Sequence, residues 1–195
     1  AGAPRAGACA AGRRAAVGGC RAGGLPSERG SRLFAARRWG APRLVASPRS
    51  AGKEFSFRDQ SLVVEALDSD LDLTGVDIAL FAAGGSISRE WAPRFVDQGV
   101  AVVDNSSAFR LDPSVPLVIP EVNGETIPRG PAIIANPNCS TIILLMALKP
   151  IWHLGPDRLV VDTYQAVSGA GLAGLDALER ESAGGEFIQG DPFPF

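Results

Sequence analysis

A cysteine at the start of an apolar segment is the residue in this chain best suited to nucleophilic chemistry. The sequence Asn-Pro-Asn-Cys-Ser-Thr occupies residues 136–141, and seven apolar residues follow it. Proline fits the first turn of a helix and Asn136 is a suitable N-cap, which places Cys139 in that turn. There the helix dipole stabilises a thiolate, and free backbone N–H groups can hold an oxyanion. A buried cysteine that packs as a small apolar side chain is the alternative.

Two more side chains have the chemistry to assist a nucleophile. Arg110 follows a polar turn, and a guanidinium can bind phosphate or carboxylate in a bidentate manner. A surface ion pair with Asp104 or Asp112 is the alternative for this arginine. Gln165 could hydrogen-bond a bound carbonyl, although amides within strands more often satisfy the backbone. His153, the single histidine, is interpreted as structural.

Short apolar segments that alternate with turns and helical segments predict the elements that position these residues. This pattern favours an α/β fold with a Rossmann-like parallel sheet covered on both faces. Ligands of such sheets bind beyond the carboxyl ends of the strands, so turns starting at Gly84, Asp104 and Asn136 should converge on one crevice. We expect buried strands at 76–82, 100–103, 117–119 and 132–135, a strand of a second sheet at 159–167 and a helix at 172–181.

Charge divides the chain into two unlike parts. Residues 1–50 carry a net charge of +9, and residues 51–195 carry −11, within an overall net charge of −2 over 195 residues. Residues 1–43 are rich in Arg, Ala, Gly and Pro without periodic large apolar residues, so we interpret them as a low-complexity leader, disordered or non-native. The rest of the chain is predicted to hold two domains, at 44–138 and 139–195, the second of them truncated.

The leader has three functional alternatives. An arginine-rich arm could bind nucleic acid, but it lacks interleaved aromatic residues, and we expect no nucleic-acid partner. A transit peptide would be rich in arginine and poor in acids, as this segment is, but would carry more serine. A vestigial glycine-rich nucleotide loop at 17–24 lacks the preceding buried strand that its function requires.

Composition argues against several other classes of protein. The longest continuous apolar run has seven residues, far fewer than the ~20 that cross a bilayer, so we expect no membrane association. Three scattered cysteines are too few for a disulfide framework or a four-ligand zinc site, and no metal is predicted. We expect a reducing compartment, the cytoplasm, or a plastid if residues 1–43 are a transit peptide.

Six motifs together resemble the aspartate-β-semialdehyde dehydrogenase family. They occur in the family's order and at similar spacing across about residues 44–190. The resemblance implies an oxidoreductase of lysine, threonine and methionine biosynthesis. In it, 44–138 would be a partial, Rossmann-like NADP-binding domain, and 139–195 would be the start of an α+β catalytic and dimerisation domain, truncated. The matching stretches are residues 46–53, 81–86, 104–110, 120–123, 136–141 and 163–171.

The resemblance also implies roles for individual residues. Cys139 corresponds to the nucleophile that forms an acyl-thioester. Ligands of the acyl-phosphate or inorganic phosphate would be Arg110 and Asn138, and Gln165 would position the substrate. The implied NADP contacts are Ser47, Arg49 and Ser50 at the 2′-phosphate, and Ala83, Gly84, Gly85, Ser168 and Gly169 near the nicotinamide.

In the implied reaction, NADPH reduces aspartyl-β-phosphate to aspartate β-semialdehyde and phosphate, in a homodimer or homotetramer. The family's N-terminal Gly-rich turn has no match in residues 1–44, and its catalytic histidine and substrate-carboxylate arginine are expected beyond residue 195. We therefore expect the isolated chain to be incomplete, and weakly active or inactive. The alternatives are an enzyme like N-acetylglutamyl-phosphate reductase, or a catalytically dead fragment that acts as a binding module.

Overall fold

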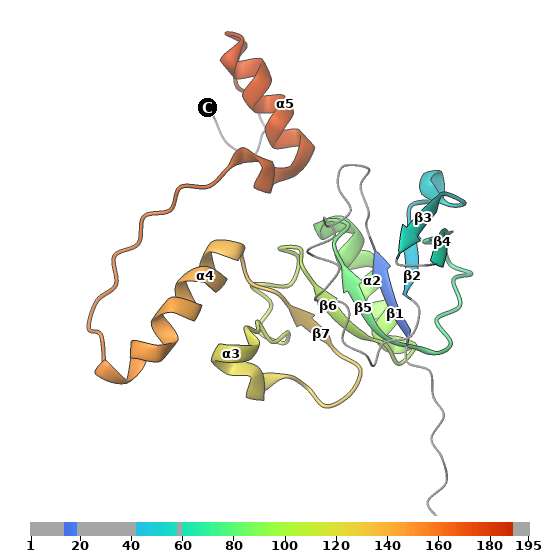
Figure 1. Cartoon of the computed structure of the whole chain (residues 1–195), viewed down its shortest axis with the longest axis horizontal. Helices are drawn as coiled ribbons and strands as arrows, with labels where there is room; N and C mark the ends of the chain where they lie inside the picture. The colour runs from blue at the N-terminus through green and yellow to red at the C-terminus, as the bar shows by residue number, and fades with distance from the viewer. Residues whose placement is uncertain (1–13, 19–41, 58–59, 189–195) are drawn as a thin grey trace, which may run out of the picture. The chain divides into compact units, whose positions relative to one another are not determined.

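The computed structural model describes residues 14–18, 42–57 and 60–188, which fall into two compact units, Ala1–Ile151 and Trp152–Phe195 (Figure 1). The first unit contains a seven-stranded sheet. Its strands are β1 (Arg14–Gly18), β2 (Arg43–Ala46), β3 (Glu54–Phe57), β4 (Gln60–Ala66), β5 (Val76–Phe81), β6 (Ala101–Asp104) and β7 (Ile133–Ala135).

The strand order is that of a doubly wound nucleotide-binding sheet. Along the sheet the strands lie in the order β3-β4-β2-β1-β5-β6-β7, and every pair is parallel except β3 with β4. The six parallel strands, counted along the chain, therefore take the order 3-2-1-4-5-6. The order reverses between β1 and β5, which is where such sheets bind their ligands. This confirms the predicted Rossmann-like parallel sheet.

The helices are short, and within the described ranges none is long and apolar enough to cross a membrane. The α-helices are α2 (Gly85–Asp97), α3 (Pro120–Asn123), α4 (Cys139–Leu148) and α5 (Gly171–Ser182). The 3-10 turns are η2 (Pro48–Ser50), η3 (Gly124–Thr126), η4 (Lys149–Leu154) and η5 (Val167–Ala170).

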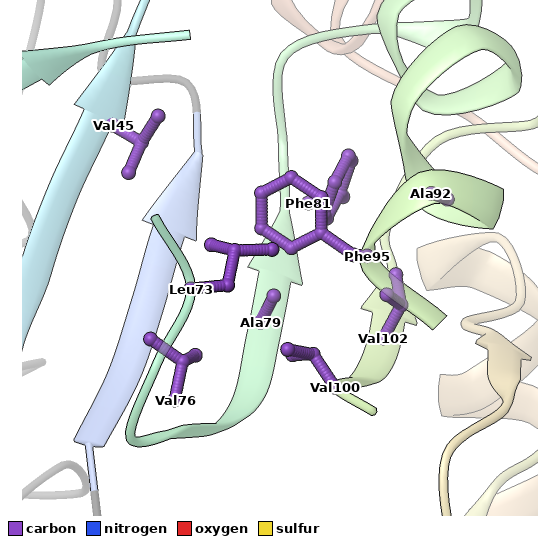
Figure 2. Packing of buried hydrophobic residues seen from close by; sticks show 9 residues of the cluster. All are labelled: Val45, Leu73, Val76, Ala79, Phe81, Ala92, Phe95, Val100 and Val102. Carbon is purple, nitrogen blue, oxygen red and sulfur yellow. The ribbon is translucent and has the colours of Figure 1, made fainter. Parts of the chain in front are cut away.

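The hydrophobic core lies between the sheet and α2. Phe81 of β5 meets Phe95 of α2 edge to face, with ring centroids 5.0 Å apart and planes at 85° (Figure 2). Ala92 lies on the same helix face, and Val100 and Val102 are fully buried beside the ring pair. Aromatic pairs in this geometry stabilise beyond the area they bury, so this contact fixes α2 against β5, the strand that precedes it.

Most elements expected after residue 44 are confirmed, and two are not. Residues 117–119 form an isolated bridge between Leu117 and Ala135 instead of a strand, because prolines without an N–H flank the segment at Pro116 and Pro120. The strand expected at 159–167 is also wrong. No described segment offers it the partner hydrogen bonds that a strand requires.

The strongest correction concerns the leader. Arg14–Gly18 forms β1, which pairs with β2 on one side and β5 on the other, so it occupies a central position in the sheet. The expectation that no strand precedes the glycine-rich stretch at 17–24 is therefore wrong. The sequence Arg-Ala-Ala-Val-Gly lacks the large apolar residues that indicate a strand. Its conformation is decided by hydrogen bonds to the parallel strands β2 and β5. Residues 19–24 lie outside the described residues, so the vestigial loop itself stays a prediction.

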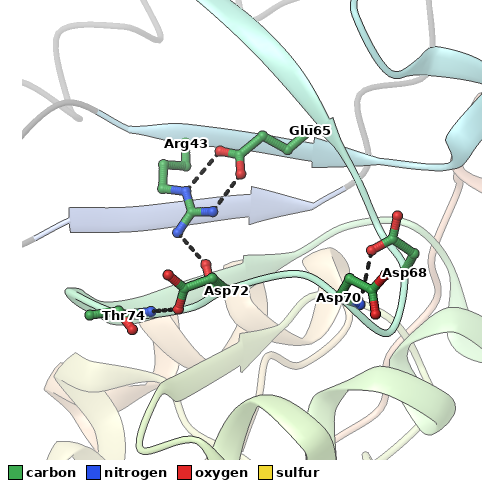
Figure 3. Close-up of polar contacts among 6 residues, drawn as sticks. All are labelled: Arg43, Glu65, Asp68, Asp70, Asp72 and Thr74. Atoms are coloured by element: carbon green, nitrogen blue, oxygen red, sulfur yellow. Dashed lines mark hydrogen bonds and ion pairs between the residues drawn. The ribbon is translucent and has the colours of Figure 1, made fainter.

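Arg43 of β2 binds both β4 and the loop that precedes β5. Its Nε donates to Glu65 of β4 over 2.7 Å, a second bond runs from Nη2 to the same carboxylate, and Nη1 donates to the Asp72 carbonyl over 2.7 Å (Figure 3). The bond to Glu65 raises the pKa of the Arg43 guanidinium. Hydrogen bonds from Thr74 lower the pKa of the Asp72 carboxyl in the adjoining loop. These contacts tie β2 and β4 to the loop that leads into β5.

We predict that Phe95→Ala lowers the free energy of unfolding by about 3–5 kcal/mol, because it removes a buried ring and leaves a cavity beside Phe81. Denaturant unfolding followed by circular dichroism measures the change. Leu111→Ala is the control, since that side chain is 97% exposed and its loss should change stability by less than about 0.5 kcal/mol. Equal stability of the two variants would contradict this packing.

Arg43→Ala is expected to lower the free energy of unfolding by about 1–3 kcal/mol, because it removes two charge-assisted bonds to Glu65 and one to the Asp72 carbonyl. The same denaturant titration measures it. Arg129→Ala, at an exposed position, is the matched loss of an arginine and should be close to neutral. A neutral Arg43→Ala would show that the three bonds do not stabilise the sheet.

Candidate functional site

The last residues of β5, β6 and β7 form one row across the sheet. Phe81 is in register with Asp104, and Asp104 with Ala135. Backbone bonds continue past this row: Asn105 N–H donates to the Phe81 carbonyl over 2.9 Å, and Asn136 N–H to the Asp104 carbonyl over 2.8 Å. The three polar turns expected to converge therefore do lie together at the carboxyl edge of the sheet.

Arg110 is held against this edge by backbone carbonyls. Its Nε donates to the Asn136 carbonyl over 2.9 Å, and its Nη2 donates to the Asn105 carbonyl over 3.2 Å. In the described part of the chain Arg110 forms no ion pair with Asp104 or Asp112. The surface ion pair is thus not formed, and no partner is described for the remaining N–H groups of the guanidinium.

The two turn asparagines bind each other. Asn136 Nδ2 donates to Asn105 Oδ1 over 2.6 Å, although 31 residues separate them in sequence. Arg110 binds the backbone carbonyls of the same two residues. The arginine and the segment leading to α4 are therefore fixed by one set of bonds.

The helix that carries the cysteine begins two residues later than predicted. Asn138, not Asn136, is the N-cap of α4, and its Oδ1 accepts the Ser140 N–H over 3.0 Å. The amide of Asn136 is already bound to Asn105, and Pro137 lies buried before the cap. Because Oδ1 makes the cap, the Nδ2 group of Asn138 remains available as a donor.

Cys139 is the first residue of α4, and its thiol is free and exposed. The alternative of a buried structural cysteine is therefore wrong. The cap takes the Ser140 N–H, and Ile142 N–H donates to the Asn138 carbonyl over 3.0 Å. Among the described residues, the N–H groups of Cys139 and Thr141 have no partner. Two donors beside a thiol are what an oxyanion formed on sulfur attack requires.

The candidate 2′-phosphate ligands lie at the same edge, beyond β2. Ser47 and Arg49 are exposed, Ser50 is half-buried, and Ser50 N–H donates to the Ser47 carbonyl over 2.8 Å in the η2 turn. Two hydroxyls and a guanidinium form a donor set of the kind that binds phosphate. These residues fit a phosphorylated cofactor by their chemistry.

The turn after β5 supplies the next candidates, Ala83, Gly84 and Gly85. Gly84 has φ +103°, a conformation that favours glycine, and it is the N-cap of α2. A Cβ at Gly85 would lie 3.5 Å from the Arg89 guanidinium and 3.9 Å from Ala108 Cβ. Because the side chains of this turn are small or absent, a bound dinucleotide could approach its backbone closely.

Three of the predicted site residues belong to the second compact unit. Gln165 is exposed, with Nε2 3.4 Å from Thr163 Oγ1, and Ser168 and Gly169 lie in η5. His153 is also in this unit. Their parts in the site stay predictions, as does the functional division of the chain at residue 139.

Sequence reasoning overlooked the fully buried polar pair Ser88 and Asp104. Ser88 Oγ donates to Asp104 Oδ1 over 2.6 Å, and both side chains have no exposed surface. The Asp-x-Ser pattern at 104–106 was the available signal, since a carboxylate in such a turn accepts the N–H two residues on. The partner on α2 could not be read from the sequence, because 16 residues separate Ser88 from Asp104.

The family model described as "Semialdehyde dehydrogenase, NAD binding domain" matches residues 32–129. The chain is 51% identical over 158 residues to an aspartate-semialdehyde dehydrogenase of Aquifex aeolicus, covering 77% of this chain and 46% of the relative. It thus spans less than half the length of that curated relative.

Two solved structures are similar to the fold. Aspartate semialdehyde dehydrogenase II from Vibrio cholerae matches with a TM-score of 0.71 and 40% identity, over 91% of this chain and 55% of that one. The Candida albicans enzyme, solved with NADP, matches with a TM-score of 0.60 and 27% identity, over 85% of this chain and 54% of that one.

Removing the cap should weaken the start of α4. Asn138→Ala is predicted to lower the free energy of unfolding by about 1 kcal/mol, because the Ser140 N–H loses its acceptor. Asn138→Asp keeps an acceptor in place and should retain most of the stability. Urea titrations of both variants test this, and an alanine variant as stable as the wild type would argue against the cap.

Proposed function

Because the chain belongs to the semialdehyde dehydrogenase family, we propose that it carries the thiol, the phosphate ligands and NADP ligands of an aspartate-semialdehyde dehydrogenase. The observation that carries the proposal is the position of Cys139 at the first residue of α4, with Arg110 bound to the same turn through the Asn136 carbonyl. Nucleophile and phosphate ligand thus lie at one edge of the sheet.

In the proposed reaction the Cys139 thiolate attacks the β-acyl carbon of aspartyl-β-phosphate. The N–H groups of Cys139 and Thr141, which have no other described partner, stabilise the oxyanion that forms. The carbon–oxygen bond to phosphate then breaks, and the leaving phosphate is held by the remaining N–H groups of Arg110 and by Asn138 Nδ2. The product of this step is a thioester on Cys139.

NADPH, when bound, supplies the hydride that reduces the thioester carbon. The carbon–sulfur bond then breaks, the aldehyde leaves and Cys139 is regenerated as the thiolate. Ser47, Arg49 and Ser50 are proposed to hold the 2′-phosphate, and their donor chemistry supports this. The backbone of Ala83, Gly84 and Gly85 is proposed to approach the nicotinamide end, together with Ser168 and Gly169.

Part of the proposal concerns the whole enzyme, of which this chain covers less than half by comparison with the relatives. We propose Gln165 as a substrate-positioning residue, assembly as a homodimer or homotetramer, and a cytoplasmic location. The pathway role is the supply of aspartate β-semialdehyde for lysine, threonine and methionine. Each of these follows from the family and not from a described contact in this chain.

The thioester step can be tested on this chain without full turnover. Incubation with aspartate semialdehyde and NADP, in the absence of phosphate, is expected to leave an aspartyl adduct on the peptide containing Cys139, which phosphate then discharges. Mass spectrometry of peptides measures it. Cys139→Ser should abolish the adduct, since a hydroxyl in its place is a far weaker nucleophile. The matched control, Cys9→Ser with Cys20→Ser, should keep it.

The outcomes separate the competing functions. An adduct from N-acetylglutamate semialdehyde, and none from aspartate semialdehyde, would favour the related reductase. Absence of any adduct on the wild-type chain would favour a catalytically dead fragment. An adduct that persists in Cys139→Ser would overturn the assignment of the nucleophile.

A further inference from the structure

Asp104 is a fully buried carboxylate for which the proposed chemistry has no use. Its Oδ1 accepts Ser88 Oγ over 2.6 Å and Ser106 N–H over 3.1 Å, and its Oδ2 accepts Ser106 Oγ over 2.7 Å. Burial of a carboxylate is costly unless donors surround it. Three donors from two segments, α2 and the turn after β6, therefore fix this side chain in one orientation.

The turn that the Asp104 side chain holds in place also carries a carbonyl that binds Arg110. The Asp104 carbonyl accepts the Asn136 N–H over 2.8 Å, and the next carbonyl, of Asn105, accepts Arg110 Nη2 over 3.2 Å. Ser106 Oγ, which donates to Asp104, also accepts the Ala108 N–H over 3.0 Å, two residues before Arg110. The turn from 104 to 110 is thus built on the carboxylate.

We propose that Asp104, clamped by Ser88, is a positioning residue that aims the Arg110 guanidinium at the phosphate of the substrate. The proposal rests on the proposed function, in which Arg110 is a phosphate ligand. Asp104 itself does not touch the ligand. It acts by holding the Asn105 carbonyl, and through Asn136 the second carbonyl that Arg110 binds.

A second Asp-x-Ser turn in the same loop provides a matched control. Asp112 Oδ1 accepts Ser114 N–H over 2.9 Å and Ser114 Oγ over 2.6 Å, which repeats the local bonds of Asp104. These bonds lower the pKa of the Asp112 carboxyl, but the group is exposed to solvent. No strand or helix partner corresponding to Ser88 is described for it. The two aspartates differ in burial and in their tie to α2.

The test is the affinity of the 195-residue chain for inorganic phosphate and for NADP, measured by isothermal titration calorimetry. Asp104→Asn should weaken phosphate binding about fivefold and leave NADP binding within twofold, because the turn from 104 to 110 carries Arg110 and none of the proposed NADP ligands. Asp112→Asn should change neither. Ser88→Ala removes one of the three bonds to Asp104 and keeps the carboxylate, so it should weaken phosphate binding about twofold. If Asp104→Asn does not fold, the phosphate and NADP affinities of Ser88→Ala test the proposal in its place.

Wild-type phosphate affinity in both Asp104→Asn and Ser88→Ala would overturn the positioning role. An equal loss of phosphate and NADP affinity would overturn it too, since a merely structural role predicts a general loss. A wild-type chain that binds NADP but not phosphate would remove Arg110 as a phosphate ligand, and the proposed function with it. The proposed function survives if phosphate binds the wild type and both variants equally.

Discussion

The parallel register of β5, β6 and β7 is the constraint on which the candidate site depends. Phe81, Asp104 and Ala135 end their strands in one row, so the turns that follow start at the same edge of the sheet. Parallel strands always place successive turns on the same side. A slip of one residue in any pair would turn every side chain of the slipped strand to the opposite face and separate the asparagines that join the turns.

Three kinds of polar group lie close to this row. A thiol stands at the start of α4, an arginine binds the carbonyls of both turn asparagines, and a buried carboxylate binds α2 and the turn that leads to the arginine. In the proposed site the thiol and the arginine meet the ligand, and the buried carboxylate keeps the turn ordered before the ligand binds. Preorganised donors of this kind contribute more to catalysis than donors that must first be ordered. The proposed site therefore depends on Asp104 as well as on Cys139.

Runs of apolar residues in the sequence correctly predicted the strands and helices that contain many large apolar side chains. The strand at 76–82 was predicted because its residues are almost all apolar. β1 was missed because Arg14–Gly18 offers small residues, and its conformation depends on two neighbouring strands. The segment at 159–167 was predicted as a strand because its β-branched residues suit one, but a strand also needs a partner.

The sequence alone determined the chemistry: the cysteine in its Asn-Pro-Asn-Cys-Ser-Thr motif, the arginine after Asp-Asn-Ser-Ser, and their order along an α/β chain. Tertiary structure decided which groups serve each other. Asn136 donates its Nδ2 to Asn105, 31 residues away, and the residue that caps α4 is Asn138. Hydrogen bonds and burial depend on neighbours that only folding brings together, whereas reactivity depends on the residue types that the sequence already contains.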